Sequence, residues 1–180
     1  MQLSLIMFII VLLQGCASKV TSIKQDQDKE LTNDKGYLLL GIQTNLNLKS
    51  IRIDGPQNIE LSSKDIKEGS SYFLLDLAVG QYTLDQLKLN RYWRRELADE
   101  EHWQFDVMPG KINYVGHLEV TTWGNWYPTT KAELVNRSSE ALEFLEEKFP
   151  NILTNRSISY GGPGQDSFFE YLANQRKEQL

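Results

Sequence analysis

Short apolar runs bounded by glycine, proline and asparagine recur about every ten residues between residues 36 and 136, which is the spacing of strands in all-β domains. Residues 72–79 and 81–89 are two such runs on either side of Gly80, and they predict a hairpin. We therefore expect a mainly β fold, an antiparallel β-sandwich of about seven strands, over residues 36–136. The longest predicted strand presents one face made of Ile112, Tyr114, Gly116, Leu118 and Val120.

The hydrophobic period lengthens from two residues to three or four after residue 136, which is typical of one face of a helix. Pro150 is expected to end a first helix, and Asp166 is expected to cap a second one. We predict that residues 137–180 form a C-terminal appendage of two short helices. The apolar residues at helical spacing in the first helix are Leu142, Leu145 and Phe149.

The composition excludes several classes of function. A formal net charge of −5 and a pI near 5.1 argue against nucleic-acid binding, which needs a basic surface. The single cysteine, Cys16, permits neither an intrachain disulfide nor a cysteine-based zinc site. The two histidines, His102 and His117, leave only a weak metal site with nearby glutamates as an alternative to surface histidines. We predict no metal and no cofactor.

The N-terminus has the pattern of a targeting signal. Residues 3–13 are almost entirely apolar, a run that fits the core of a secretory signal peptide and is too short to span a bilayer. The run ends in LQGC (residues 13–16), which resembles the bacterial lipobox, where the cysteine is lipidated and becomes the mature N-terminus. We predict a signal peptide over residues 1–15 and a lipidated Cys16. The alternative is a free cysteine behind an ordinary signal peptide.

The lipobox resemblance implies attachment to a membrane without a spanning helix, because two or more acyl chains make anchoring stable. The next residues, Ala17 and Ser18, are not the aspartate that marks inner-membrane retention, which favours the outer membrane and leaves its face open. Residues 16–35 are polar and contain no aromatic side chain. We expect this lipidated N-terminus to continue as a flexible tether that spans on the order of 25 Å.

Two stretches resemble prealbumin-like, or carboxypeptidase-regulatory-like, β-sandwich domains. AVGQYTL (residues 78–84) is similar to their G-x-Y-x-L strand, and FDVMPGKINYVG (residues 105–116) is similar to the next strand, Pro-Gly turn and long strand. Uncharacterised Gram-negative lipoproteins pair such a sandwich with a short helix ending in Phe-Pro or Tyr-Pro, as residues 145–150 do here. The resemblance implies a transthyretin- or Ig-like fold over residues 36–150. It implies no catalytic residue, because members share no active site.

Aromatic side chains are the best candidates for a binding site. Trp123, Trp126 and Tyr127 follow the longest predicted strand in a segment that also contains glycine, asparagine and proline, and Tyr92 and Trp93 lie among arginines. Exposed rings of this kind bind a sugar ring or an apolar patch on a partner protein. The alternative is that the rings fill the end of the sandwich core.

The charges around the second aromatic pair form two blocks of opposite sign. Residues 91–95 carry three arginines, and residues 96–101 are mostly acidic. We interpret this stretch as an exposed hairpin that neutralises its own charge. The alternative is an anion site or a contact with lipopolysaccharide phosphate.

Catalytic motifs are absent from the sequence. It contains no G-x-S-x-G elbow, and its paired glutamates are adjacent in the chain, so their side chains diverge. We expect a lipid-anchored cell-envelope protein, a non-enzymatic binding or assembly module at the outer membrane, with a membrane contact and an envelope protein or glycan as partner. The alternative is a glycan-binding module or weak hydrolase acting on cell-wall or surface polysaccharide.

Overall fold

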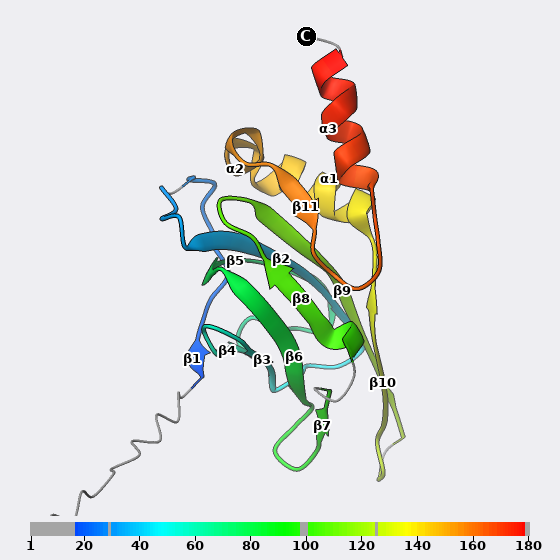
Figure 1. The fold of residues 1–180 in the computed structure, drawn as a ribbon. Coiled ribbons are helices and arrows are strands. Elements are labelled where there is room, and N and C mark those ends of the chain that lie inside the picture. Colours follow the sequence, from blue (N-terminus) through cyan, green and yellow to red (C-terminus); the bar gives the residue numbers. More distant parts are fainter. Residues whose placement is uncertain (1–16, 29, 98–100, 125, 179–180) are drawn as a thin grey trace, which may run out of the picture.

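The computed structural model describes residues 17–28, 30–97, 101–124 and 126–178, and it shows a mainly β protein (Figure 1). Within these residues the chain forms two β-sheets and three α-helices. The signal peptide and lipobox predicted from the sequence, including Cys16, lie outside the described residues. No helix in the described part is long and apolar enough to cross a membrane.

Apart from β6, the strands of the first sheet are short. Its hydrogen-bonded order is β1 (Ser18–Lys19), β4 (Ile59–Ser62), β3 (Ser50–Asp54), β6 (Gly80–Lys88) and β7 (Arg94–Glu96). β8 (Gln104–Val107) pairs with the first half of β6, while β7 pairs with its last residues. A short 3-10 helix, η1 (Glu101–Trp103), leads into β8. The edge that carries β7 therefore lies four strands away from the edge that carries β1.

The second sheet contains the long strands. Its order is β10 (Thr129–Val135), β9 (Ile112–Trp123), β2 (Lys35–Thr44) and β5 (Gly69–Ala78), and β11 (Ile158–Tyr160) also pairs with β9. β10 confirms the strand expected over residues 131–135. β2 is buried along almost its whole length because it lies at the centre of this sheet between β5 and β9.

A single apolar cluster fills the space between the two sheets. It is built by alternate residues of strands from both sheets, so these strands turn one face toward each other. Trp103, from η1, is also part of this cluster and is almost completely buried. Typical members are Leu38 and Leu40 of β2, Ile51 and Ile53 of β3, Tyr82 and Leu84 of β6, and Val115 and Leu118 of β9.

The strand pairing differs from the expected antiparallel arrangement. β2 and β9 run parallel, as do β1 and β4 and also β9 and β11, so both sheets are mixed. The hairpin expected around Gly80 is wrong, because β5 pairs with β2 in the second sheet while β6 pairs with β3 in the first. The Pro109-Gly110 turn also joins the two sheets, from β8 to β9. Hydrophobic alternation identifies a strand but does not identify its partner.

The C-terminal region contains one more helix than expected. α1 (Ser138–Lys148) ends before Pro150, as predicted, but Pro150 then begins α2 (Pro150–Asn155). Proline fits the first position of a helix, where its missing N–H is not needed. The expected cap of the closing helix, α3 (Phe168–Glu178), is confirmed, since the Asp166 carboxylate accepts the N–H of Phe168 at 2.9 Å.

α1 and α2 pack on the outer face of the second sheet, and α3 extends away from it (Figure 1). Their apolar residues and those of β2, β5 and β9 form a second buried cluster. Residues 137–178 lie against the second sheet and also add β11 to it, beside β9. The cluster contains Tyr37, Leu39, Leu74, Ile112 and Tyr114 from the sheet, and Ala141, Leu145, Phe149, Ile152 and Phe169 from the helical layer.

The segment expected as a flexible tether lies against the domain over its described first part. The Ser22 hydroxyl accepts the N–H of Leu74 in β5 at 3.0 Å. The Asp26 carboxylate accepts the first N–H groups of α2 at 2.8 and 3.0 Å, and Asp28 forms an ion pair with Arg156 at 3.0 Å. The polar residues that suggested a solvated coil therefore bind specific groups of the domain, including the unpaired N–H groups at the start of a helix.

Candidate binding surface

All five aromatic residues singled out from the sequence are exposed. Trp126 and Tyr127 are 88% and 83% exposed, and Tyr92 is 78% exposed. Trp123 and Trp93 are about half-exposed, at 53% and 40%. The alternative in which these rings fill the end of the core is therefore not the arrangement in the structure. We call Tyr92, Trp93, Trp123, Trp126 and Tyr127 the aromatic end.

The aromatic end is carried by two connections from different sheets. Tyr92 and Trp93 lie between β6 and β7 of the first sheet, whereas Trp123 is the last residue of β9 in the second sheet. Trp126 and Tyr127 lie between β9 and β10. In Figure 1, β7 and the tip of the β9–β10 pair both lie at the end of the molecule opposite α3. Connections on a rigid scaffold are where binding residues commonly collect.

Contacts between the two connections hold the aromatic end together. The Asn90 side-chain oxygen accepts the N–H groups of Tyr92 and Trp93 at 2.8 and 3.0 Å, which fixes the first connection as a tight turn. The Trp93 ring then meets the Tyr127 ring edge-on, with centroids 6.4 Å apart. The Arg95 guanidinium donates to the backbone oxygen of Thr130 in β10. Aromatic residues far apart in sequence therefore form one surface.

Arginines lie beside Tyr92 and Trp93. The Arg91 guanidinium lies 5.0 Å from the centre of the Tyr92 ring, and Arg94 forms an exposed ion pair with Glu96 at 3.0 Å. The second contact agrees with the expected hairpin that neutralises its own charge. An open cavity of about 250 Å³ lies beside Trp93, and its lining includes Arg94, Arg95 and Thr130. This surface can offer aromatic stacking and cationic hydrogen-bond donors to one ligand.

The exposure of Trp126 leads to a first prediction. Trp126→Ala is expected to change the free energy of unfolding by less than about 0.5 kcal/mol, because the ring buries little surface in the domain. Chemical denaturation measures this change, and Trp103→Ala is the matched control because Trp103 is in the core. A loss of stability in Trp126→Ala comparable to that of the control would show that the ring is a packing residue.

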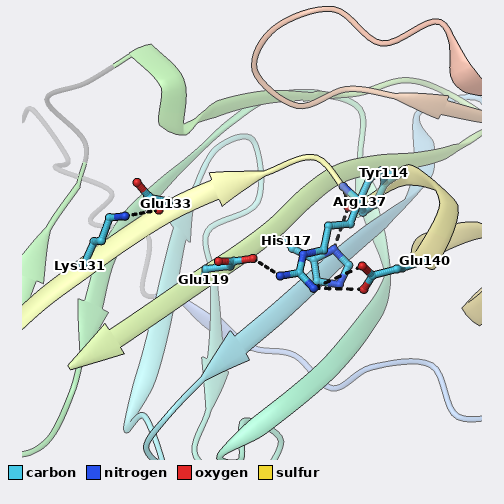
Figure 2. Close-up of polar contacts among 7 residues, drawn as sticks. All are labelled: Tyr114, His117, Glu119, Lys131, Glu133, Arg137 and Glu140. Atoms are coloured by element: carbon cyan, nitrogen blue, oxygen red, sulfur yellow. Dashed lines mark hydrogen bonds and ion pairs between the residues drawn. The ribbon is translucent and has the colours of Figure 1, made fainter. Parts of the chain in front are cut away.

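A polar cluster that was not expected from the sequence lies on the face of the second sheet that packs against the helices, and its buried members are Tyr114 and His117. The Tyr114 hydroxyl lies 2.8 Å from His117 Nδ1 and accepts the backbone N–H of Arg137 at 2.9 Å (Figure 2). The Arg137 side chain pairs with Glu119 on β9 and with Glu140 on α1 at 3.3 Å. These contacts connect the long strand β9 to the start of α1.

The hydrogen bonds indicate the protonation state of His117. Because the Tyr114 hydroxyl already accepts one N–H, it can donate its own proton to Nδ1, which leaves the imidazole proton on Nε2. His117 is fully buried, and Nε2 has no hydrogen-bond partner among the described residues. Burial, followed by the positive charge of Arg137, lowers the pKa of His117 to about 4. The ring is therefore neutral at physiological pH.

This cluster is not a candidate active site. His117 has no exposed surface, so no substrate reaches its ring in the folded protein. The metal alternative that pairs it with His102 is not supported, because His102 is exposed and packs against Trp103 beside the first sheet. Among the described residues, no group of three or more His, Cys, Asp or Glu side chains is placed to hold a metal. The cluster instead fixes α1 on the sheet.

A second open cavity of about 290 Å³ lies among the helices. Its apolar lining includes Leu142 from α1, Leu153 from α2 and Phe169 from α3. Arg156 also lines it, but this side chain is already paired with Asp28. We favour the aromatic end as the binding surface because five large rings are exposed there.

Comparison of the chain with protein families, with curated proteins and with solved structures gave no match. The interpretation of the aromatic end therefore rests on its geometry and chemistry.

Proposed function

We propose that the protein is a lipid-anchored component of the bacterial cell envelope, held at the outer membrane through Cys16, and that it acts as a non-enzymatic binding module. The observation that carries the binding role is the aromatic end, where two connections carry five exposed rings and meet at the contact between Trp93 and Tyr127. Large rings lose few rotamers on binding and bury large areas, which makes them common anchors of interfaces.

We also propose that the two sheets form a β-sandwich. Two sheets that share one buried cluster support a sandwich of the transthyretin- or Ig-like type. In such folds the connections at one end of the sheets often carry the binding residues, as the connections after β6 and β9 do here.

A glycan is the second candidate for the bound partner. The open cavity beside Trp93, with Arg94 and Arg95 in its lining, supports this alternative because sugars stack on aromatic rings and accept hydrogen bonds from arginine. Soluble fragments of cell-wall polysaccharide, added to the purified protein, test it by their effect on tryptophan fluorescence.

The lipid anchor is tested by substitution of the cysteine. Cys16→Ser is expected to abolish labelling by a fatty-acid analogue and to move the protein from the membrane to the soluble fraction of cells, because a diacylated cysteine supplies stable anchoring. Ser18→Ala, two residues away, is the matched control and should keep both label and location. Unchanged labelling and membrane association in Cys16→Ser would reject the anchor.

A further inference from the structure

The start of β1 limits how far the domain can lie from a lipid on Cys16. Ser18 is already hydrogen-bonded to Asn58 at 2.9 Å and paired with Ile59. An extended chain spans at most about 3.3–3.6 Å per residue, so Cys16 lies within about 7 Å of Ser18. A lipid on Cys16 therefore holds the domain directly at the bilayer surface, and not at the distance expected for a long free tether.

The residues after β1 supply no slack while the segment is packed. Ser22 bonds to β5, Asp26 bonds to the start of α2, and Asp28 pairs with Arg156. The segment that contains them therefore extends from the edge of the first sheet to the helices. The point of attachment is therefore the β1 edge of the first sheet.

The aromatic end is placed to contact the same bilayer. β1 and β7 are opposite edges of the first sheet, separated by four strand spacings, or about 19 Å. In Figure 1, β1 lies at one side of the sheets, and β7 and the tip of the β9–β10 pair lie at the lower end. The helices lie at the upper end. A flat surface that touches the start of β1 and the aromatic end leaves the helices on the far side.

The chemistry of the aromatic end fits a membrane interface. Tryptophan and tyrosine are enriched at the level of lipid headgroups, where the ring is in an apolar environment and its polar atom is in a wet one. The two most exposed rings, Trp126 and Tyr127, are in the connection between β9 and β10, and the exposed Arg91 can bind a headgroup phosphate. A net charge of −5 gives the whole chain no general attraction to anionic lipids, so this contact is local.

We propose that the partner of the aromatic end is the phospholipid headgroup layer of the membrane that holds Cys16. The lipid supplies attachment, and the aromatic end fixes the orientation, with the helical layer directed away from the bilayer. This inference rests on the proposed lipid anchor and assigns a partner to the proposed binding surface.

Tryptophan fluorescence tests this orientation because the chain has four tryptophans, three of them in the aromatic end and the fourth, Trp103, in the core. The full chain is purified in its lipidated form and reconstituted into vesicles of phosphatidylethanolamine and phosphatidylglycerol with brominated acyl chains. We expect strong quenching by the brominated lipids and loss of quenching by aqueous iodide, because the rings lie at the interface.

Two variants locate the quenched rings. The triple variant Trp93→Phe, Trp123→Phe and Trp126→Phe retains only Trp103 and should lose nearly all quenching by brominated lipids. Tyr171→Trp places an exposed tryptophan on α3, at the other end of the molecule, and its added emission should stay accessible to iodide. The variants change exposed positions, and circular dichroism checks that the fold is kept.

Three outcomes would overturn the proposal. Rings that stay accessible to iodide while the protein sediments with the vesicles would leave the lipid anchor intact and reject the membrane contact of the aromatic end. A fluorescence change on addition of cell-wall glycan, with none from brominated lipid, would assign the surface to a glycan. Absence of lipid on Cys16 by mass spectrometry would reject the anchor and, with it, this orientation.

Discussion

Gly41→Ala is expected to lower the free energy of unfolding by about 3 kcal/mol, because the added methyl group collides with the buried His117 ring. A Cβ at this position would lie 2.3 Å from both Cδ2 and Nε2 of His117. The ring has little room to move, since Tyr72 packs edge-on against it at 4.7 Å and Tyr114 holds Nδ1. Denaturant unfolding, followed by circular dichroism, measures the loss.

A loss of stability is the opposite of the usual effect of replacing glycine by alanine. Replacing glycine by alanine commonly stabilises a protein by about 0.4–1 kcal/mol when the backbone permits it, and Gly41 does not have a positive φ. A loss of stability must therefore come from the close approach of β2 to His117.

The double variant Gly41→Ala/His117→Ala is the decisive control. With the ring removed, the methyl group of residue 41 enters vacated space, so Gly41→Ala should cost close to nothing in the His117→Ala background. A double-mutant cycle should thus give a coupling free energy of about 2–3 kcal/mol. Equal costs in the two backgrounds would show that the collision is relieved by other movements.

The sequence predicted the elements better than their arrangement. The cap at Asp166 and the strand over residues 131–135 depend on local chemistry, and both are present. The changes of sheet at Gly80 and at Pro109-Gly110 depend on which strands become neighbours, which is a long-range property. Glycine and proline at these positions predict a turn whether the two flanking strands pair with each other or belong to different sheets.

One residue accounts for a wrong assignment of faces along β9. The alternation placed Ile112, Tyr114 and Leu118 on one face, but Tyr114 packs toward the helices and Leu118 packs between the sheets. Gly116, with φ +113°, lies at the irregularity, and the register of β9 with β2 shifts there. A bulge inserts one residue into the alternation and moves all later side chains to the opposite face. His117 thereby reaches the helical side, which hid the buried cluster from sequence analysis.

The exposure of the aromatic end could be argued from sequence only in part. A glycine, an asparagine and a proline near Trp123 and Trp126 predicted a connection, and the structure places the rings there. The contact between Trp93 and Tyr127 joins two sheets, so it could not follow from any local pattern. The same is true of Asp28, whose partner Arg156 lies at the other end of the chain.

The pKa of His117 predicts that the protein loses stability on mild acidification. Its pKa is lowered from the usual 6.5 to about 4 in the folded state, so the folded protein keeps this ring neutral below the pH at which the unfolded chain protonates it. The unfolded state therefore binds more protons between about pH 6.5 and pH 4. The contribution of neutral His117 to the free energy of unfolding is complete above about pH 6.5. It falls by about 3 kcal/mol as the pH is lowered to about 4.

The charged groups around the ring determine how specific this effect is. Arg137 opposes protonation of His117, whereas Glu119 and Glu140 favour it, and both carboxylates are already paired with Arg137. Protonation would also end the donation from the Tyr114 hydroxyl, because a protonated Nδ1 can only donate a hydrogen bond. Burial is the largest cause of the lowered pKa, so the charges only modify the effect.

Denaturant unfolding of the wild type and of His117→Gln at a series of pH values from 7 to 4 measures this contribution. The wild type should lose stability steadily across the range, while the glutamine variant, which carries no titrating group at residue 117, should show a much flatter curve whatever its starting stability. His102→Gln is the matched control, since His102 is exposed, and it should keep the wild-type slope. Equal slopes in the wild type and His117→Gln would show that the carboxylates of the domain, and not the buried imidazole, set its sensitivity to acid.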